Sequence, residues 1–443
     1  MKATLTGRLS TLATSRRTQA VSSTSAVAAL LLGVVGIGAS TDSQAIPGFA
    51  RQTGMACAAC HTTFPAINAF GRAFKAGGYV LVGAQPLIEG ENLSLPSTLN
   101  MSLITKLRYN KTNGNTGSGN DRGAIEWPNE AAFLVGGRLS ERIGFLAEIA
   151  LGGATETDVE VDPITGLGSG SGDTNGLFGL KIPFNVGQAG NTSFSIIPFS
   201  TDGLGVAYGF ELLNTGALRS QRSIENRSGF SAAQALNIGV GEATGMAFVA
   251  SAPEFFFNYT PWTPGWSGNN MDVGTGFAHY FRGAYMPTLG SWDTGFGFQY
   301  LTGDAKPTDG DGVVTPIKTD SWVIDAQANG EVGGLPLSLY ASYGSADAGT
   351  AWNTNAGDAD AFAVMAQLGG LLSSKANVFL GYRTMDNGKA TANKDNALTI
   401  GGQYFPAQNV KLELFHVMES GSAIDARADE RDNLTMLQFF AGF

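Results

Sequence analysis

Leu437-Gln-Phe-Phe-Ala-Gly-Phe443 closes the chain, and Val410-Lys-Leu-Glu-Leu-Phe-His-Val-Met-Glu419 precedes it. In both stretches apolar residues recur at every second position. Successive side chains of a β-strand point to opposite faces, so each stretch would form a strand with one apolar and one polar face. Segments of about ten residues with this pattern are typical of transmembrane β-barrels. A terminal aromatic residue after such a strand also looks like the signal read by the outer-membrane assembly machinery.

The same alternation recurs much earlier, in Leu99–Tyr109 and Ile143–Leu151. Short turns such as Ser140–Arg142 and Gly333-Gly334 alternate with long polar stretches such as 155–175 and 302–318. This asymmetry fits short periplasmic turns and long outer loops. A soluble β-sandwich or a solenoid would also alternate, but no repeat of fixed period is visible and the strands are too many for one sandwich. We therefore predict an all-β, antiparallel transmembrane barrel.

The barrel is predicted to occupy residues 96–443. At about ten residues per strand plus unequal connections, an even count near 16 strands is expected. A barrel of that size would enclose a wide polar lumen. The acidic net charge of −10 argues against a nucleic-acid partner, since binding nucleic acid needs a basic surface. Outer-membrane lipid is the partner that the apolar outer face predicts.

The first 45 residues predict a cleaved, Sec-type signal peptide. Arg8, Arg16 and Arg17 form a positive region, an apolar run follows from 26 to 39, and Ser43-Gln44-Ala45 resembles a cleavage site. The apolar run is shorter than the roughly 20 residues that a transmembrane helix needs. Export to the bacterial outer membrane is the expected localisation.

Residues 57–61 read Cys-Ala-Ala-Cys-His and contain both cysteines of the chain. This is the C-x-x-C-H pattern of covalent haem attachment. Two thiols add to the two vinyl groups of the porphyrin, and the adjacent imidazole ligates the iron. A redox dithiol would not need His61, and a zinc site lacks further ligands nearby. Cys57, Cys60 and His61 are therefore predicted to bind one covalent haem c, with His61 as the iron ligand.

Residues 46–95 are predicted to form this haem segment and its linker. Pro65 suits the first turn of a helix that Gly77-Gly78 ends. Arg72 and Lys75 could meet the haem propionates, and four apolar residues at helical spacing could pack on the porphyrin or form an ordinary helix core: Phe64, Ile67, Phe70 and Phe74. The segment is too short to wrap a porphyrin alone, so we expect it to lodge in the barrel lumen.

The phase of the alternation in each strand predicts whether further side chains point outward or into the lumen. His279 and His416 fall in the outward phase. Candidates for the sixth iron ligand are weak: Met365, Met385 and Met436 in the lumen phase, Met55 near the motif, or no protein ligand. Five basic residues in the lumen phase either face the propionates or line a water-filled pore: Lys106, Arg108, Arg138, Arg282 and Arg383.

The run from Phe49 to Tyr79 resembles the haem segment of the fused monohaem cytochrome–porins, outer-membrane proteins best known from iron-oxidising bacteria. The resembling features are Phe49–Gly54, the motif itself, Pro65, and the stretch from Phe70 to Tyr79. The barrel part is similar only in type, length and terminal aromatic residue. The resemblance is therefore short but specific.

The resemblance implies an electron conduit across the outer membrane. Extracellular Fe(II), or a similar small donor, would reduce the haem, and a periplasmic c-type cytochrome or another carrier would take the electron. Acidic outer loops around 156–162, 309–311 and 425–432 either gather Fe(II) or are simply solvated. The alternative is a passive diffusion porin whose haem segment is structural or senses redox state. A plugged lumen would favour the conduit and an open pore the porin; whether the chain counts as an Fe(II)-oxidising enzyme stays open.

Overall fold

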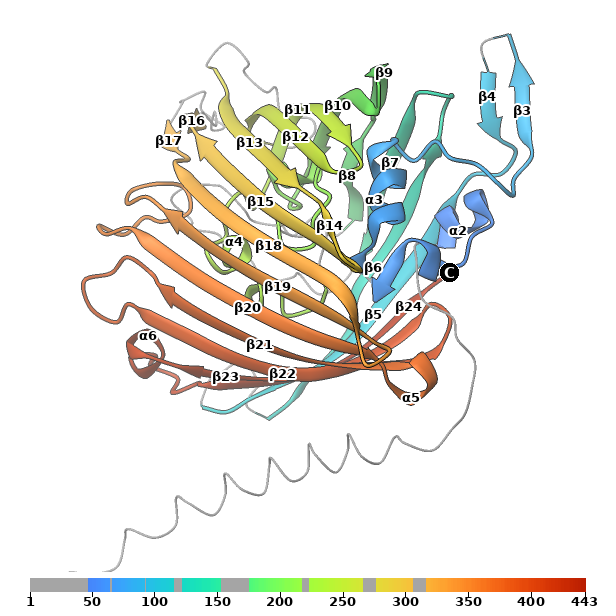
Figure 1. Cartoon of the computed structure of the whole chain (residues 1–443). Helices are drawn as coiled ribbons and strands as arrows, with labels where there is room; N and C mark the ends of the chain where they lie inside the picture. Colours follow the sequence, from blue (N-terminus) through green and yellow to red (C-terminus); the bar gives the residue numbers. More distant parts are fainter. Residues whose placement is uncertain are drawn as a thin grey trace, which may run out of the picture. The chain divides into compact units, whose positions relative to one another are not determined.

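The computed structural model describes residues 47–63, 66–91, 93–114, 122–152, 175–216, 223–265, 276–305 and 316–443. Most of these residues form one closed antiparallel β-barrel (Figure 1). The predicted signal peptide, 1–45, lies outside the described residues. Among the residues described, no helix is both long enough and apolar enough to span a membrane.

The barrel closes where its last strand pairs with its first, Leu434 opposite Thr112. β8 and β9 share the neighbour β10, and β13 and β14 share β15, so each pair is one interrupted strand. Counted in this way, the described residues form sixteen strands, as predicted. The segments are β5 (Met101–Thr112), β6 (Ala124–Arg138), β7 (Gly144–Gly152), β8 (Asn175–Lys181), β9 (Phe184–Ala189), β10 (Thr192–Thr201), β11 (Ala243–Ala252), β12 (Phe255–Thr263), β13 (Ala278–Tyr285), β14 (Thr288–Leu289), β15 (Trp292–Thr302), β18 (Ser321–Val332), β19 (Leu335–Ala346), β20 (Ala359–Gly370), β21 (Ala376–Asp386), β22 (Lys394–Ala407), β23 (Val410–Ser420) and β24 (Asn433–Gly442).

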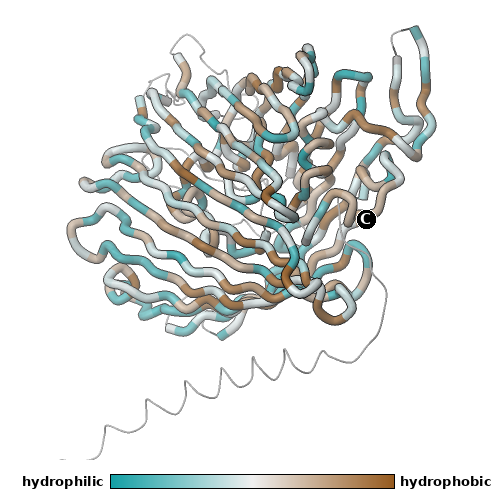
Figure 2. The backbone as a smooth tube through the Cα atoms, viewed as in Figure 1, coloured by the Kyte–Doolittle hydropathy of each residue, from teal (hydrophilic) through white to brown (hydrophobic). Residues whose placement is uncertain are grey.

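The alternation along each strand separates an apolar outer face from an inner face, and brown and white or teal residues alternate along the tube in Figure 2. In β23 the polar residues Lys411 and Glu413 are buried inside the barrel, while Leu412 and Leu414 are half-buried on its outside. Apolar groups meet lipid and polar groups are kept from it. The predicted phase of this strand is therefore confirmed.

The connections at the two ends of the barrel differ in length, also as predicted. At one end, Gly333 and Gly334 join β18 to β19, both with positive φ (61° and 79°), the geometry that lets a two-residue turn follow the strand twist. Gln408 and Asn409 join β22 to β23 at the same end. At the other end the connections are longer, for example 347–358, 421–432 and 202–242.

The described residues before the barrel form two short helices and two small hairpins. The elements are α2 (Pro47–Thr53), the 3₁₀ turn η1 (Cys57–Ala59), β1 (His61–Thr63), β2 (Ala66–Ile67), α3 (Ala69–Ala76), β3 (Leu87–Gly90) and β4 (Leu93–Pro96). The helix predicted to start at Pro65 starts instead at Ala69, because the Asn68 side chain accepts a hydrogen bond from the Gly71 amide and caps it. Phe64 and Pro65 lie outside the described residues. Gly78, at φ 75°, follows the helix end as expected.

The long-loop end carries the remaining elements: β16 (Asp304–Ala305) and β17 (Ile317–Lys318), and α6 (Ser422–Asp425). α5 (Leu371–Ser374) lies at a short turn. Three elements belong to the connection 202–242: η2 (Val206–Tyr208), η3 (Arg227–Gly229) and α4 (Ala232–Ala235). We call residues 202–242 the interior loop, because its described part enters the barrel.

Candidate functional site

The three predicted haem ligands lie on one tight turn. The Cys60 amide donates to the Cys57 carbonyl over 3.1 Å, and Asn68 closes the turn from both sides. The Asn68 amide donates to the Cys60 carbonyl (2.9 Å), and its side-chain Nδ2 donates to the Ala59 carbonyl (3.0 Å). Cys57 is buried, whereas Cys60 and His61 are half-exposed. One flank of the turn is therefore accessible to a group that binds it.

The donor set fits a c-type haem. The two cysteines form no disulfide. Burial, together with the nearby Cys57, raises the pKa of the Cys60 thiol, so this thiol keeps its proton. Two thiols on one turn followed at once by an imidazole are the groups that thioether attachment and proximal iron ligation require. Cys57 and Cys60 would hold the porphyrin, and His61 would ligate the iron.

This turn sits at the short-turn end of the barrel rather than at mid-height. Gln408, in the turn between β22 and β23, places its Nε2 3.6 Å from the Cys57 Sγ. The Gly48 amide donates to Ser102 Oγ at the start of β5 (2.7 Å). The expectation that the segment 46–95 lodges in the lumen therefore holds only in part. The Cys57–His61 turn lies at the rim, while α3 reaches inward, where Ala76 packs against the cluster of Phe210 and Leu213.

Arg72 does not have the role that the sequence suggested. Its two terminal nitrogens bind the two carboxylate oxygens of Asp293 at 2.9 and 2.6 Å, and its side chain is almost fully buried. A bidentate arginine–carboxylate pair is a strong, directional contact. Arg72 therefore ties α3 to β15 and is not available to a haem propionate.

The apolar residues of α3 divide into two groups. Phe74 packs against Phe49 and Tyr79, with ring centroids 5.1 and 5.7 Å away, and Phe49 stacks on Tyr79 at 5.1 Å. Phe74 thus belongs to an ordinary core between α2 and α3. Phe70 is 39% exposed, so of these two phenylalanines it is the one still able to cover a porphyrin.

The interior loop crosses the lumen and contacts opposite walls. On one side Glu225 binds Lys106 (3.0 Å) and Arg108 (2.9 Å), both in β5. On the other side Glu211 binds Arg282 in β13 (2.8 Å). Asn226 donates to Thr399 in β22 (2.9 Å). A single loop is therefore held across the width of the barrel.

Arg282 is the centre of a buried ionic cluster. Its guanidinium binds Glu211 of the loop and Asp325 of β18 (2.6 Å), and all three side chains are 0% exposed. Thr215 donates to Asp325 (2.5 Å), and the amides of Leu212 and Leu213 donate to Glu211. Burial raises the pKa of Glu211, and Arg282 opposes that rise. The cluster fixes the loop to two strands at once.

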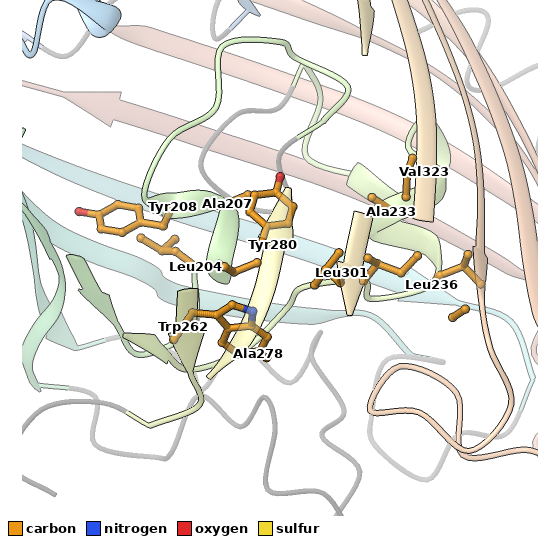
Figure 3. Packing of buried hydrophobic residues seen from close by; sticks show 14 of the residues in the cluster. Leu204, Ala207, Tyr208, Ala233, Leu236, Trp262, Ala278, Tyr280, Leu301 and Val323 are labelled. Atoms are coloured by element: carbon orange, nitrogen blue, oxygen red, sulfur yellow. The ribbon is translucent and has the colours of Figure 1, made fainter. Parts of the chain in front are cut away.

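Apolar packing fills the space that polar contacts leave. Leu204, Tyr208 and Leu236 of the interior loop pack among lumen-facing residues of several strands, including Trp262 and Leu301 (Figure 3). The inward side chains are buried rather than wet: Lys106 is 1% exposed, Arg108 4%, Arg282 0%, Glu413 0% and Gln438 0%. The wide polar lumen expected from the strand count is therefore wrong for the described residues, because the interior loop occupies it.

Four of the five basic residues assigned to the lumen phase, Lys106, Arg108, Arg282 and Arg383, are buried, so they do not line a water-filled pore. That they face haem propionates stays a prediction. Lys106 also binds Glu130, Arg383 binds Asp395, and Arg138 donates to the Ser94 carbonyl. Burying an ion is tolerated when it is paired and hydrogen-bonded, as the four buried residues are. Arg138 is half-buried and contacts the β3–β4 hairpin instead.

Two of the four candidate methionines and both outward histidines have other partners. Met365 and Met436 pack with Phe230 of the interior loop in one apolar cluster. His279 pairs with the Tyr259 hydroxyl (3.0 Å) and His416 with Thr435 (2.8 Å), on the outward face as predicted. The acidic stretches 156–162 and 309–311 lie outside the described residues. No group of three or more potential metal-ligating side chains gathers in the described parts of the chain.

The pH dependence of stability tests whether Lys75 of α3 is buried near the interior loop. Burial lowers its pKa from 10.5 to about 8, and nearby Glu211 limits the fall. Between about pH 8 and 10.5 the unfolded chain thus binds the Lys75 proton more than the folded chain does, so this group makes stability rise with pH. We expect the urea midpoint of the wild type to rise across that window and Lys75→Met to lose the rise. Parallel pH curves would contradict this placement of Lys75.

Glu211, Glu225 and Asp325 hold the interior loop to the barrel wall, and the sequence analysis missed them. The apolar stretch Leu204–Leu213, which carries only one charge, was the available signal, since outer loops are otherwise polar. Such a stretch in a long connection indicates burial. It does not reveal which strands the stretch will meet.

Comparison with known proteins bears on the fold alone. No family model matches the chain, and no curated protein matches it. Among solved structures, OprB of Pseudomonas putida is similar over 78% of this chain and 94% of its own, with 15% identity and a TM-score of 0.53. The channel DcaP of Acinetobacter baumannii is similar over 78% and 97%, with 12% identity and a TM-score of 0.46. The similarity to OprB, together with the closed barrel, gives this chain the fold of an outer-membrane porin barrel.

Proposed function

We propose that this chain is an outer-membrane cytochrome–porin that carries electrons across the membrane through one covalent haem. The observation that supports a conduit over a diffusion porin is the filled lumen. The described residues of the interior loop contact opposite walls, and inward side chains such as Arg282 and Glu413 are fully buried. A pore for solutes needs water along its walls, whereas electron transfer needs only a donor, a haem and packed protein between them.

The haem itself rests on Cys57, Cys60 and His61 and on the resemblance of Phe49–Tyr79 to cytochrome–porin haem segments. When bound, the haem supplies one-electron chemistry. The chain's own residues bind it, hold its turn against the barrel rim through Gln408, and set how much water reaches it. Extracellular Fe(II) is the proposed donor: it loses one electron as the ferric haem gains one. A periplasmic carrier then takes that electron.

The position of the turn leaves a gap towards the long-loop end, because the apolar band of such a barrel is about 25 Å tall. Aromatic side chains pack in series from Tyr79, just after α3, towards a long loop. The Lys181 ammonium lies over the rings of Tyr79 (5.9 Å) and Tyr208 (4.5 Å), and Tyr208 meets Phe199 at 6.4 Å. Trp262 lies in the same cluster as Phe199 and stacks at 6.4 Å on Trp352 of a long loop. This packed series supports electron transfer between the two ends.

A conductance measurement separates the two functions. In planar bilayers the intact protein is expected to pass little ion current, because the interior loop fills the lumen. Replacing residues 203–241 by a short turn between β10 and β11 is expected to produce a stable, large conductance. The matched control shortens 421–432, a loop whose contacts are at the rim (Arg427 with Glu419, Asp432 with Asn113). Large currents through the intact protein would favour the diffusion porin instead.

A further inference from the structure

Three buried side-chain amides lie beside the haem-binding turn. In the β1–β2 hairpin, His61 is directly opposite Ile67. Opposite residues of an antiparallel pair have Cα atoms about 4.5–5.5 Å apart. The Ile67 amide donates to Asn214 Oδ1 over 3.2 Å, and Asn214 is 0% exposed. The interior loop therefore places Asn214 one contact away from the predicted iron ligand.

A hydrogen bond links Asn214 to the barrel wall. Its backbone amide donates to Gln327 Oε1 over 2.8 Å. Gln327 and Asn329 are two residues apart on the inward face of β18, and both are buried. Asn329 in turn lies opposite Asp293, the partner of Arg72. We call Asn214, Gln327 and Asn329 the amide patch; it joins the haem segment, the interior loop and the wall.

Among the residues that the structure describes, the amide patch finds no acceptors for its donors. Asn214 Nδ2, Gln327 Nε2 and both polar atoms of Asn329 are buried and have no hydrogen-bond partner among the described residues. Buried polar groups are almost always satisfied, and leaving one unsatisfied is costly. Three amide NH₂ groups call for an acceptor that takes several hydrogen bonds at once. A carboxylate, with two oxygens and about four acceptor positions, meets that need.

We propose that the amide patch binds a carboxylate, and that this carboxylate is a propionate of the haem attached at Cys57 and Cys60. This assignment rests on the proposed function, because it needs the haem. The patch takes the role that the sequence suggested for Arg72, whose guanidinium is engaged by Asp293. A diffusing carboxylate has the same chemistry and is the other source that the experiment must separate.

The test is the pH dependence of the haem midpoint potential in the full-length protein. Hydrogen bonds to a carboxylate favour its ionised form and lower its pKa. The wild-type potential should therefore be flat near neutral pH. Asn329→Leu removes a donor and should move the pH-dependent part of the curve towards neutral by about one unit. Asn329→Asp keeps the shape of the side chain but adds a like charge, and should move it further.

Asn377→Leu is the matched control, since Asn377 is also a buried inward asparagine but donates to Gln403 in β22. Its curve should superimpose on that of the wild type. If the Asn329 variants carry haem and their curves also superimpose on the wild-type curve, the propionate assignment is overturned and the proposed function stands. A wild-type curve that shifts with added acetate would assign the patch to a diffusing carboxylate and overturn it too. Absence of covalent haem from the wild type would overturn both.

Discussion

Replacing Cys57 and Cys60 together by serine is expected to remove all covalently bound haem while leaving the barrel folded. Serine cannot form the thioether bonds, and both residues precede the first barrel strand, Met101–Thr112. The measurement is haem-stained, denaturing gel electrophoresis with a pyridine haemochrome spectrum of the purified protein. Barrel integrity is checked by the heat-dependent shift in gel mobility.

His61→Met supplies the companion variant. It keeps both thiols, so covalent haem should remain in part, while the loss of the imidazole should change the haem spectrum. Gln408→Ala is the control at the same turn, since Gln408 touches Cys57 without taking part in attachment; it should retain the haem. If the double serine variant still stained for haem, the assignment of Cys57 and Cys60 would be wrong. If the wild type never stained, the haem proposal itself would fail.

Arg282→Met is expected to destabilise the barrel more than any other single substitution in the lumen. It leaves Glu211 and Asp325 without their counter-charge in a site where all three side chains are 0% exposed. Removing one partner of a buried ion pair costs about 3–5 kcal/mol. The measurement is the free energy of unfolding in urea, in detergent micelles. The interior loop should also detach, so the variant should conduct ions.

A triple variant tests whether the uncompensated charges cause the loss of stability. Arg282→Met with Glu211→Gln and Asp325→Asn removes the uncompensated charges, so most of the lost stability should return. Arg383→Met is the matched control, because the Arg383–Asp395 pair is more exposed than the Arg282 cluster and its loss should cost less. Equal stability of Arg282→Met and the wild type would show that the cluster does not hold the loop.

The strands of this protein could be predicted because the residue types along each strand reflect the two environments that its faces meet. In Val410–Glu419 the alternation of apolar and polar residues fixes which side chains meet lipid, and β23 bears this out from Lys411 to His416. The C-x-x-C-H motif was equally visible, since it fixes three residues within five positions, and the haem that it predicts stays a proposal. Both signals are local and need no knowledge of distant parts of the chain.

The contents of the lumen could not be predicted in the same way. Glu211 and Arg282 are far apart in sequence, and nothing in the chain near either residue indicates that they pair. Arg72 looked free for a propionate because its partner Asp293 lies far along the sequence. The start of α3 was misplaced because Asn68 caps the helix more effectively than Pro65 marks it. Tertiary contacts decided each of these cases.

Stopped-flow absorbance tests the central claim most directly. Purified, oxidised protein in detergent is mixed with Fe(II) at the growth pH of its source, and the haem spectrum is followed. The account predicts rapid appearance of the sharp bands of reduced haem, and no such change in the Cys57→Ser/Cys60→Ser variant. A haem that dithionite reduces but Fe(II) leaves oxidised would contradict iron as the donor, and a protein without a haem spectrum would contradict the electron conduit.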